Sequence, residues 1–152
     1  MIKVNDNIID FSLYDESGNL VSLSELKNKY IIVYFYSKDN TSGCTNQALE
    51  YRNLYSEFQK YDVKIIGISK DTVKSHCSFR QKHDIPFTLL ADEAKDVINK
   101  YDVFKEKNMY GKKIMGVLRS SFIIKDGKFV KVSYNVKPLE DAKNNLEFIK
   151  NN

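Results

Sequence analysis

The chain has 152 residues, of which 42% are hydrophobic and 29% charged, and this composition is typical of a soluble globular protein with one core. Its net charge of +4 comes from 24 Lys and Arg against 20 Asp and Glu, and because the basic residues are spread along the chain, a nucleic-acid-binding surface is not indicated. No stretch approaches the roughly 20 apolar residues of a membrane span and the first residues lack a signal-peptide pattern, so we expect one domain, residues 1–152, in the cytoplasm and away from membranes.

The first elements in chain order are a hairpin and a buried strand. Alternating apolar residues around a Ser-Gly-Asn turn predict a β-hairpin over residues 10–23. Ser24 is expected to cap a short turn that runs through Leu26. The run Tyr30–Tyr36, YIIVYFY, is apolar and partly β-branched throughout, and seven such residues favour a strand that is buried on both faces.

Helices and strands then alternate. Apolar residues three and four positions apart mark amphipathic helices, and short apolar runs between them mark buried strands. Asp71 is expected to cap the second helix. The predicted segments are helix Cys44–Tyr61, strand Val63–Ser69, helix Asp71–His83, strand Pro86–Asp92 and helix Glu93–Tyr101.

A second hairpin follows. Asp126-Gly127 is the strongest hairpin turn signal in the chain, and it predicts strands over Val117–Ile124 and Lys128–Tyr134. The preceding segment, residues 104–116, is expected to be irregular. A last helix should run from near Pro138 through Ile149.

This order of elements predicts the fold class. Strand–helix alternation favours a parallel core, because a parallel crossover needs a helix to cover the sheet. The terminal hairpin adds an antiparallel edge. We therefore expect an α/β protein with a mixed central sheet, an N-terminal β-hairpin and flanking helices, of which the thioredoxin fold is one example.

The loop after the first buried strand carries one of only two cysteines. Cys44 is predicted in the first turn of a helix, where unpaired backbone N–H groups and the helix dipole favour a thiolate, the nucleophilic form of cysteine. Thr41 offers a hydroxyl three residues earlier, and Gly43 leaves backbone N–H groups open to a small oxygen-containing substrate. From these residues alone, a reactive thiolate and a small buried thiol remain equally open for Cys44, and Thr41 can also be a plain N-cap.

The segment SKDNTSGC, residues 37–44, resembles the peroxiredoxin signature P-x-x-x-T-x-x-C, and YFYSKDNTSGCTNQA is similar to the bacterioferritin-comigratory, or Q-type, branch of that family. Three further segments resemble that branch in order and spacing, namely DFSLYDESGNLVSLSEL, GISKDTVKSHCSFRQKHDIPFTLLAD and MYGKKIMGVLRSSFIIKDGK. The resemblance covers nearly the whole chain. It implies a thioredoxin fold and a thiol-dependent peroxidase that needs no cofactor and no metal.

The resemblance also assigns roles to residues. Cys44 matches the peroxidatic cysteine, whose thiolate attacks a hydroperoxide and becomes a sulfenic acid. Thr41 matches the threonine that donates to the peroxide, and Arg119 matches the arginine that stabilises the thiolate and the developing charge. The backbone N–H groups of Cys44 and Gly43 complete the pocket. Implied partners are hydrogen peroxide or organic hydroperoxides and thioredoxin or a similar thiol reductant, and we expect a monomer rather than a dimer.

The chain departs from the family pattern at several positions. Ser37 and Ser42 stand where prolines are usual, which predicts a loop less pre-organised by about 0.4–1 kcal/mol per site. Leu49 occupies the position of a common resolving cysteine. The other thiol, Cys77, lies in the next helix, where some relatives carry a resolving cysteine. We expect a Cys44–Cys77 disulfide, with a single-cysteine peroxidase and a structural Cys77 as the alternative.

Three other classes of function compete with a peroxidase. A thiol hydrolase would pair Cys44 with His76 or His83. A dithiol exchanger would need a second cysteine three residues after the first, and none is present. A thioredoxin-fold binding domain without catalytic activity is the alternative from outside the enzymes.

Overall fold

The structure is a computed structural model that describes the backbone of residues 1–152 and every side chain except that of Met109. The strands are β1 Ser12–Asp15, β2 Leu20–Ser22, β3 Tyr30–Phe35, β4 Val63–Ser69, β5 Thr88–Ala91, β6 Phe104–Met109, β7 Lys112–Val117, β8 Ser120–Lys125 and β9 Lys128–Ser133. The helices are α1 Ser42–Asn53, α2 Tyr55–Gln59, α3 Val73–Lys82, α4 Asp96–Lys100 and α5 Asp141–Lys150, and Leu23–Glu25 form a 3₁₀ turn.

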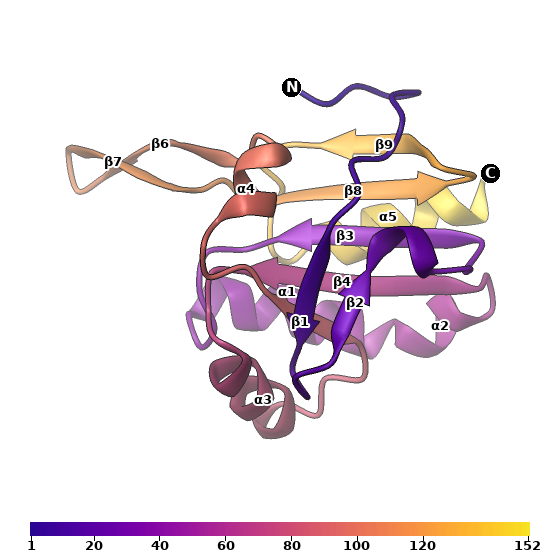
Figure 1. Ribbon diagram of the computed structural model, residues 1–152, viewed down its shortest axis with the longest axis horizontal. Coiled ribbons are helices and arrows are strands. Elements are labelled where there is room, and N and C mark those ends of the chain that lie inside the picture. The colour runs from indigo at the N-terminus through magenta and orange to yellow at the C-terminus, as the bar shows by residue number, and fades with distance from the viewer.

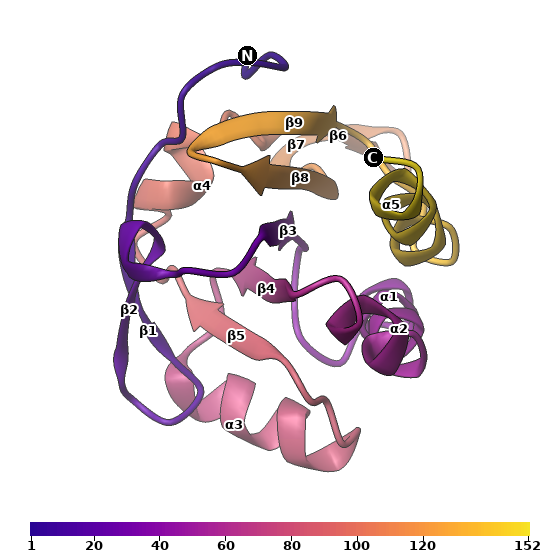
Figure 2. The same cartoon turned by 90° about the vertical axis from the view of Figure 1, so that its right-hand side faces the viewer.

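A seven-stranded mixed sheet, in the order β2-β1-β5-β4-β3-β8-β9, runs through the molecule (Figure 1). β3, β4 and β5 are parallel, whereas β1, β2, β8 and β9 join by antiparallel pairing. Helices α1, α2 and α5 lie together on one side of the sheet and α4 lies on the other (Figure 2). The predicted mixed sheet with flanking helices is therefore confirmed.

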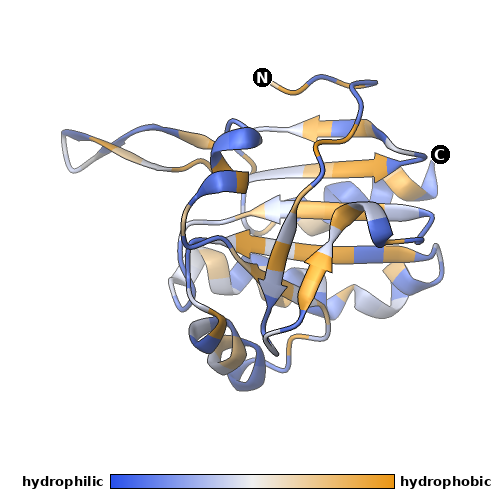
Figure 3. Ribbon diagram, viewed as in Figure 1, coloured by the Kyte–Doolittle hydropathy of each residue, from blue (hydrophilic) through white to orange (hydrophobic). Residues whose placement is uncertain are grey.

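The sheet separates two cores, and β3 contributes to both. Hydrophobic residues are concentrated in the strands of the central sheet (Figure 3). Alternate side chains of β3 point to opposite faces, as the pleat of a strand requires. Tyr30, Ile32 and Tyr34 pack under α1 and α5, and Ile31, Val33 and Phe35 pack toward α4. None of the six is more than 6% exposed, which confirms a strand buried on both faces.

Both hairpins that flank the core have the predicted turns, although β8 begins three residues later than the strand predicted from Val117. Ser12–Asp15 pairs with Leu20–Ser22 around the first turn, and β8 pairs with β9 around the second. Asp126 and Gly127 have φ angles of 53° and 75°, the left-handed pair that a tight hairpin turn requires.

The prediction that residues 104–116 are irregular is wrong. They form most of a second, two-stranded sheet, β6 with β7, which projects from the body of the molecule (Figure 1). The turn is Tyr110-Gly111, with φ angles of 52° and 79°. Five of the six cross-strand pairs include a charged residue, and apolar residues do not alternate with polar ones along either strand, so the pattern of a half-buried strand is missing from the sequence. Val117 consequently belongs to β7, and β8 begins at Ser120.

Helix boundaries differ from the prediction where local capping decides them. Helix α1 begins at Ser42, two residues earlier than predicted, and Thr41 stands at the N-cap position without a side-chain capping bond. Thr72, and not Asp71, caps α3, since its hydroxyl accepts the N–H of Ser75. Helix α4 begins at Asp96 and not at Glu93, because Lys95 has a φ of 61°, in the left-handed region outside the α-helix.

Three smaller differences concern the ends of other elements. The predicted helix Cys44–Tyr61 is divided at Leu54, with nothing in the local sequence to signal the break. Ser24 lies within the 3₁₀ turn, whose N-cap is Ser22. The last helix starts at Asp141, just after Pro138.

Within the described residues, no helix combines the length and the apolar character that crossing a membrane requires.

Phe122→Ala should strongly destabilise the protein. Phe122 is fully buried and its ring contacts Phe35, Tyr101 and Phe129 edge-on. Truncation of such a side chain costs about 3–5 kcal/mol through lost burial and the cavity left behind. Urea unfolding measures the loss. Tyr110→Ala, at a side chain that is 98% exposed, is the control and should change the free energy of unfolding by less than about 0.5 kcal/mol.

Candidate active site

Two segments that are distant in sequence meet at one edge of the sheet. β3 and β8 are antiparallel, with Phe35 opposite Ser120, so β3 ends where β8 begins (Figure 1). The loop that follows β3 leads into α1 and Cys44. Arg119 immediately precedes β8. The pairing of these two strands therefore brings Arg119 beside Cys44.

The sulfur of Cys44 is enclosed and is held by polar groups. Cys44 is the third residue of α1 and is 1% exposed. Its Sγ lies 3.4 Å from the hydroxyl of Ser37 and 3.4 Å from Nη2 of Arg119. A thiolate at this position accepts hydrogen bonds from one neutral and one charged donor.

These contacts favour the thiolate over the thiol. Burial raises the pKa of Cys44, because it removes water from the charged form. Hydrogen bonds from the main chain of Lys38 and from the hydroxyls of Ser37 and Thr41 act in the opposite direction. The positive charge of Arg119 adds to them, and the net result is a pKa of Cys44 below the usual value for a thiol.

The absence of a side chain at Gly43 leaves room for the guanidinium of Arg119. A Cβ on Gly43 would lie 3.1 Å from Nη2 of Arg119 and 3.5 Å from Cγ of Pro138. The sequence suggested that Gly43 leaves its backbone open to substrate. In the structure the guanidinium takes that space, so the missing side chain allows Arg119 to approach the sulfur.

Thr41 lies at the start of α1 without capping it. Its hydroxyl makes no bond to the N–H groups of the first helical turn and donates instead to the carbonyl of Lys38 at 2.9 Å. The same hydroxyl is close enough to Cys44 to lower the pKa of the thiol. Because a hydroxyl has one hydrogen that rotates, Thr41 can exchange the carbonyl for the sulfur or for a substrate oxygen.

A buried carboxylate fixes the loop between β3 and α1. Asp39 accepts hydrogen bonds from the hydroxyls of Tyr36 at 2.6 Å and Ser75 at 2.8 Å, and its Oδ2 lies 2.8 Å from Nδ1 of His76. The N–H of Asp39 donates to Asp71 at 2.8 Å. We call these contacts of Asp39 with Ser75, His76 and Asp71 the loop clamp. It ties the loop that holds Cys44 to α3 and to the segment before it.

The loop clamp bears on the prediction that two serines loosen this loop. Asp39 is 4% exposed, and burial raises the pKa of its carboxyl, but hydrogen bonds from His76 and its neighbours lower it more, so the pKa falls below its usual value. A charged carboxylate fixed in this way restricts the motion of the loop in which Ser37 and Ser42 replace the usual prolines. Ser37 also supplies a hydroxyl to the sulfur, which a proline cannot do.

The histidines do not form a nucleophile–base pair with Cys44. His76 is fully buried, and its ring nitrogens face Asp39 and the carbonyl of Leu90, the latter at 3.0 Å. His83 is the C-cap of α3, where its carbonyl accepts from Arg52. The arrangement needed for a thiol hydrolase is therefore not present among the described residues.

The loop clamp is also the group of side chains with the closest likeness to a metal site. One ligand atom each from Asp39, Asp71 and His76 lies within 4.8 Å of the others. These atoms are already engaged in hydrogen bonds to one another and to the hydroxyls of Ser69 and Ser75. The cluster thus satisfies its own polar atoms as a structural network.

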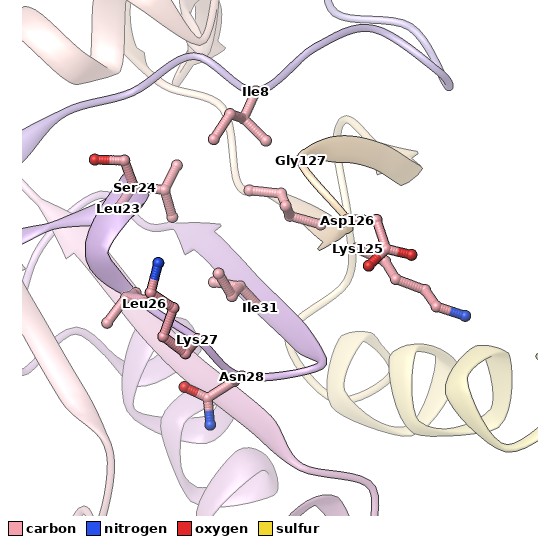
Figure 4. A pocket seen from close by; sticks show the side chains of 11 residues that line it. Ile8, Leu23, Ser24, Leu26, Lys27, Asn28, Ile31, Lys125, Asp126 and Gly127 are labelled. Atoms are coloured by element: carbon pink, nitrogen blue, oxygen red, sulfur yellow. The ribbon is translucent and has the colours of Figure 1, made fainter.

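A cavity of about 220 Å³ lies at the other end of the sheet and is not part of this site. It is formed where the first 3₁₀ turn meets the start of β3 and the β8–β9 turn (Figure 4). Its lining includes Leu23, Leu26, Ile31, Ile124, Asp126 and Gly127. No residue of the Cys44 loop takes part in it.

Cys77 is half-buried and both cysteines are free thiols. Successive residues of a helix are about 100° apart, so Cys77 is about 200° around α3 from Ser75, whose side chain faces Asp39. Arg80, one turn after Cys77, reaches Glu16 beyond β1 at 3.1 Å. Cys77 therefore lies on the flank of α3 that faces away from the Cys44 loop.

Sequence reasoning missed two residues that hold Arg119. Nη1 of Arg119 donates to Oε1 of Gln47 at 2.7 Å, and Nε2 of Gln47 donates to Asp141 at 3.0 Å. Gln47 follows Cys44 by three residues, so helical spacing could have placed it beside the sulfur. Nothing in the sequence signals that Asp141, at the start of α5, would reach it.

Comparison with known proteins agrees with this geometry. Residues 4–133 match the model of the AhpC/TSA family. The chain belongs to this peroxiredoxin family. It is 38% identical to Peroxiredoxin Bcp of Bacillus subtilis over 150 residues, which cover 98% of this chain and 96% of the relative.

Two solved structures extend the likeness. A cysteine-to-serine mutant of PrxQ from Xylella fastidiosa has a TM-score of 0.93 and 31% identity, covering 99% of this peroxiredoxin and 97% of the other chain. The bacterioferritin comigratory protein of Xanthomonas campestris, whose structure is described with alkyl peroxide reduction activity, has a TM-score of 0.88 and 34% identity, covering 96% and 98%. The peroxiredoxin is a thiol peroxidase of the bacterioferritin-comigratory, Q-type branch, and its predicted thioredoxin fold is confirmed.

In this peroxiredoxin, Gly43→Ala should weaken the thiolate without weakening α1. The added Cβ, 3.1 Å from Nη2, displaces the guanidinium and raises the pKa of Cys44, while alanine is the better helix former by up to about 1 kcal/mol. The pH dependence of Cys44 alkylation measures the change. Asn46→Ala, at an exposed position of the same helix, is the control. An unaltered pH dependence in the glycine variant would mean that this contact does not hold Arg119.

Proposed function

We propose that Cys44 is the peroxidatic cysteine of this thiol peroxidase. Its thiolate attacks the terminal oxygen of a hydroperoxide, an S–O bond forms and the O–O bond breaks. The departing oxygen takes up a proton and leaves as water or an alcohol, and Cys44 becomes a sulfenic acid. The observation that carries this assignment is the 3.4 Å contact between Nη2 of Arg119 and a sulfur whose pKa is lowered.

Arg119 and Thr41 have separate roles in this step. Arg119 keeps a permanent charge against the sulfur and stabilises the negative charge that moves onto the departing oxygen. The Thr41 hydroxyl turns from the carbonyl of Lys38 to donate to the peroxide. The N–H groups of Gly43 and Cys44, in the first turn of α1, have no intrahelical acceptor and complete the set of donors.

Substrate reaches the sulfur through the start of α1. Cys44 is 1% exposed, whereas Thr41 and Ser42, which precede it, are exposed. A small displacement of this turn uncovers the sulfur to hydrogen peroxide or to an organic hydroperoxide. The alkyl peroxide activity named for the Xanthomonas campestris relative supports the organic hydroperoxides as substrates.

Cys77 resolves the sulfenic acid. The Cys77 thiol attacks the Cys44 sulfur, an S–S bond forms and water leaves. Because a disulfide needs Cα atoms within about 7 Å and Cys77 faces away from the loop, the first turns of α1 and α3 must both unwind. Thioredoxin or a similar dithiol then reduces the disulfide. The protein acts as a cytoplasmic monomer of one domain.

The two cysteines should respond differently to substitution. Cys44→Ser should abolish turnover in a peroxidase assay coupled to thioredoxin, because no nucleophile remains. Cys77→Ser should still consume one equivalent of peroxide but lose turnover, because no internal disulfide forms. Mass spectrometry of the oxidised wild-type protein should find a peptide that links Cys44 to Cys77.

The opposite results have defined meanings. Two results together would establish a single-cysteine peroxidase reduced by an external thiol. One is full turnover of Cys77→Ser in the presence of reductant, and the other is a sulfenic acid at Cys44 that persists when no reductant is added. This second mechanism is favoured by the position of Cys77 on the side of α3 that faces away from the Cys44 loop. Activity in Cys44→Ser would remove the proposed role of Cys44 altogether.

Arg119→Lys should slow the reaction although it keeps the charge. Lysine cannot donate to Gln47 and to the sulfur at once through a planar fork, so we expect kcat/KM for peroxide to fall by about 10²-fold, the effect of losing one well-placed donor. The rate should also rise at higher pH than in the wild type, since the pKa of Cys44 increases. Stopped-flow kinetics across pH measures both. Arg80→Lys, at the Glu16 ion pair, is the control, and equal profiles for the two variants would contradict the role of Arg119.

A further inference from the structure

The guanidinium of Arg119 is the end of a buried relay. Nη1 of Arg119 donates to Oε1 of Gln47 at 2.7 Å, and Nε2 of Gln47 donates to Oδ2 of Asp141 at 3.0 Å. Gln47 is fully buried and Asp141 is 1% exposed. The link between Gln47 and Asp141 therefore joins α1 to α5 without contact with solvent, and only the Arg119 end of the relay is half-buried.

The chemistry of the three groups allows one arrangement. A guanidinium only donates hydrogen bonds, an ionised carboxylate only accepts them, and a primary amide does both at opposite ends. Gln47 must therefore turn its NH₂ group toward Asp141 and its carbonyl toward Arg119. The carboxylate thus determines that an acceptor faces Nη1, and this acceptor keeps Nη2 directed at the sulfur of Cys44.

Asp141 is itself rigidly held. Its Oδ2 also accepts from the hydroxyl of Tyr51 at 2.6 Å, and its Oδ1 accepts from the hydroxyl of Ser121 at 2.7 Å. Asn145 donates to both hydroxyls, at 2.8 Å and 3.2 Å. These donors come from α1, β8 and α5, so the carboxylate is the point at which three elements join behind the active site.

A purely structural role does not account for a charged group at this position. No ion pair to Asp141 occurs among the described side chains, and burying an unpaired carboxylate is costly. Four donors, from Gln47, Tyr51, Ser121 and, at 3.5 Å, Asn145, converge on its two oxygens, whereas asparagine would present one oxygen and one donor group. Two cations lie near the carboxylate without bonding to it: Lys131, which donates to Asn145 at 2.6 Å, and Arg119 at the far end of the relay.

We propose that Asp141 is a positioning residue for the peroxidase reaction, which acts through Gln47 to hold the guanidinium of Arg119 against Cys44. The inference rests on the proposed roles of Cys44 and Arg119. It adds that the reactivity of the sulfur depends on a carboxylate in the C-terminal helix that touches neither the sulfur nor the substrate.

Asp141→Asn tests the proposal in a Cys77→Ser background, where Cys44 is the one thiol. The amide at position 141 no longer forces the orientation of Gln47, so Arg119 loses its fixed acceptor. We expect the thiol pKa measured from the pH dependence of Cys44 alkylation to rise by about one unit, which is about tenfold less thiolate at lower pH. The rate constant for peroxide should fall with it. Alkylation needs no peroxide, so this readout is separate from the proposed function.

A rescue separates positioning from folding. Asp141→Asn combined with Gln47→Glu moves the carboxylate one link closer to Arg119, where it accepts from the guanidinium and from the new amide. This double variant should recover most of the alkylation profile. Ser121→Ala is the matched control, because it removes one hydrogen bond to Asp141 and leaves the relay intact. It should lower stability in urea unfolding without moving the profile.

Two results would overturn the proposal. One is an unchanged alkylation profile in a folded Asp141→Asn variant, and the other is a shifted profile that Gln47→Glu does not restore. If Asp141→Asn does not fold, Gln47→Leu interrupts the relay while Asp141 keeps Tyr51 and Ser121. Gln47→Leu should then shift the profile in the same direction, and the wild-type profile in that variant would equally overturn the proposal.

Discussion

The antiparallel pairing of β3 with β8 is the constraint on which the rest of the site depends. Phe35 lies opposite Ser120, and this register places the loop after β3 beside Arg119, although Arg119 and Cys44 are 75 residues apart. Side chains alternate between faces along a strand, so a slip of one residue would exchange the residues of β8 between the two cores and move Arg119 away from the sulfur. Both cores oppose such a slip, because β3 and β8 are buried on both faces. The energy that fixes the active site therefore comes mainly from apolar packing behind it.

That packing creates a problem at the sulfur, which is buried yet has to ionise. The structure offsets the cost of burial with donors that are fixed before the thiolate forms, namely the loop main chain, two hydroxyls and a guanidinium. Each donor is supported by a further group. The loop clamp at Asp39 holds the main chain and Ser37, and Gln47 with Asp141 holds Arg119. Pre-organisation of this kind means that little has to move when charge develops.

The sequence was sufficient to predict the parts of this arrangement that depend on local pattern. Continuous apolar runs identified β3 and β4, and the change from strand to helix placed Cys44 at a helix N-terminus. The hairpin of β6 and β7 was not predicted because apolar and polar residues do not alternate along either strand, and only its base, at Phe104 and Val117, packs against the core. The roles of Asp141 and Gln47 were not predicted for a different reason. A buried carboxylate and a buried amide look like surface residues in a sequence, and only the tertiary arrangement of α1 and α5 gives them partners.

The groups that support the thiolate also oppose the resolving step proposed for Cys77. Asp39 bonds to Ser75 and His76 of α3, the helix that carries Cys77, so the contacts that position the Cys44 loop also keep α3 wound. If Cys77 resolves the sulfenic acid as proposed, it cannot reach Cys44 until those contacts open. Oxidation favours their opening, because a sulfenic acid is neutral and no longer attracts Arg119 as a thiolate does. The loss of that attraction weakens the first turn of α1, which is where unwinding has to begin. The same electrostatic interaction thus favours the folded loop before the reaction and releases it afterwards.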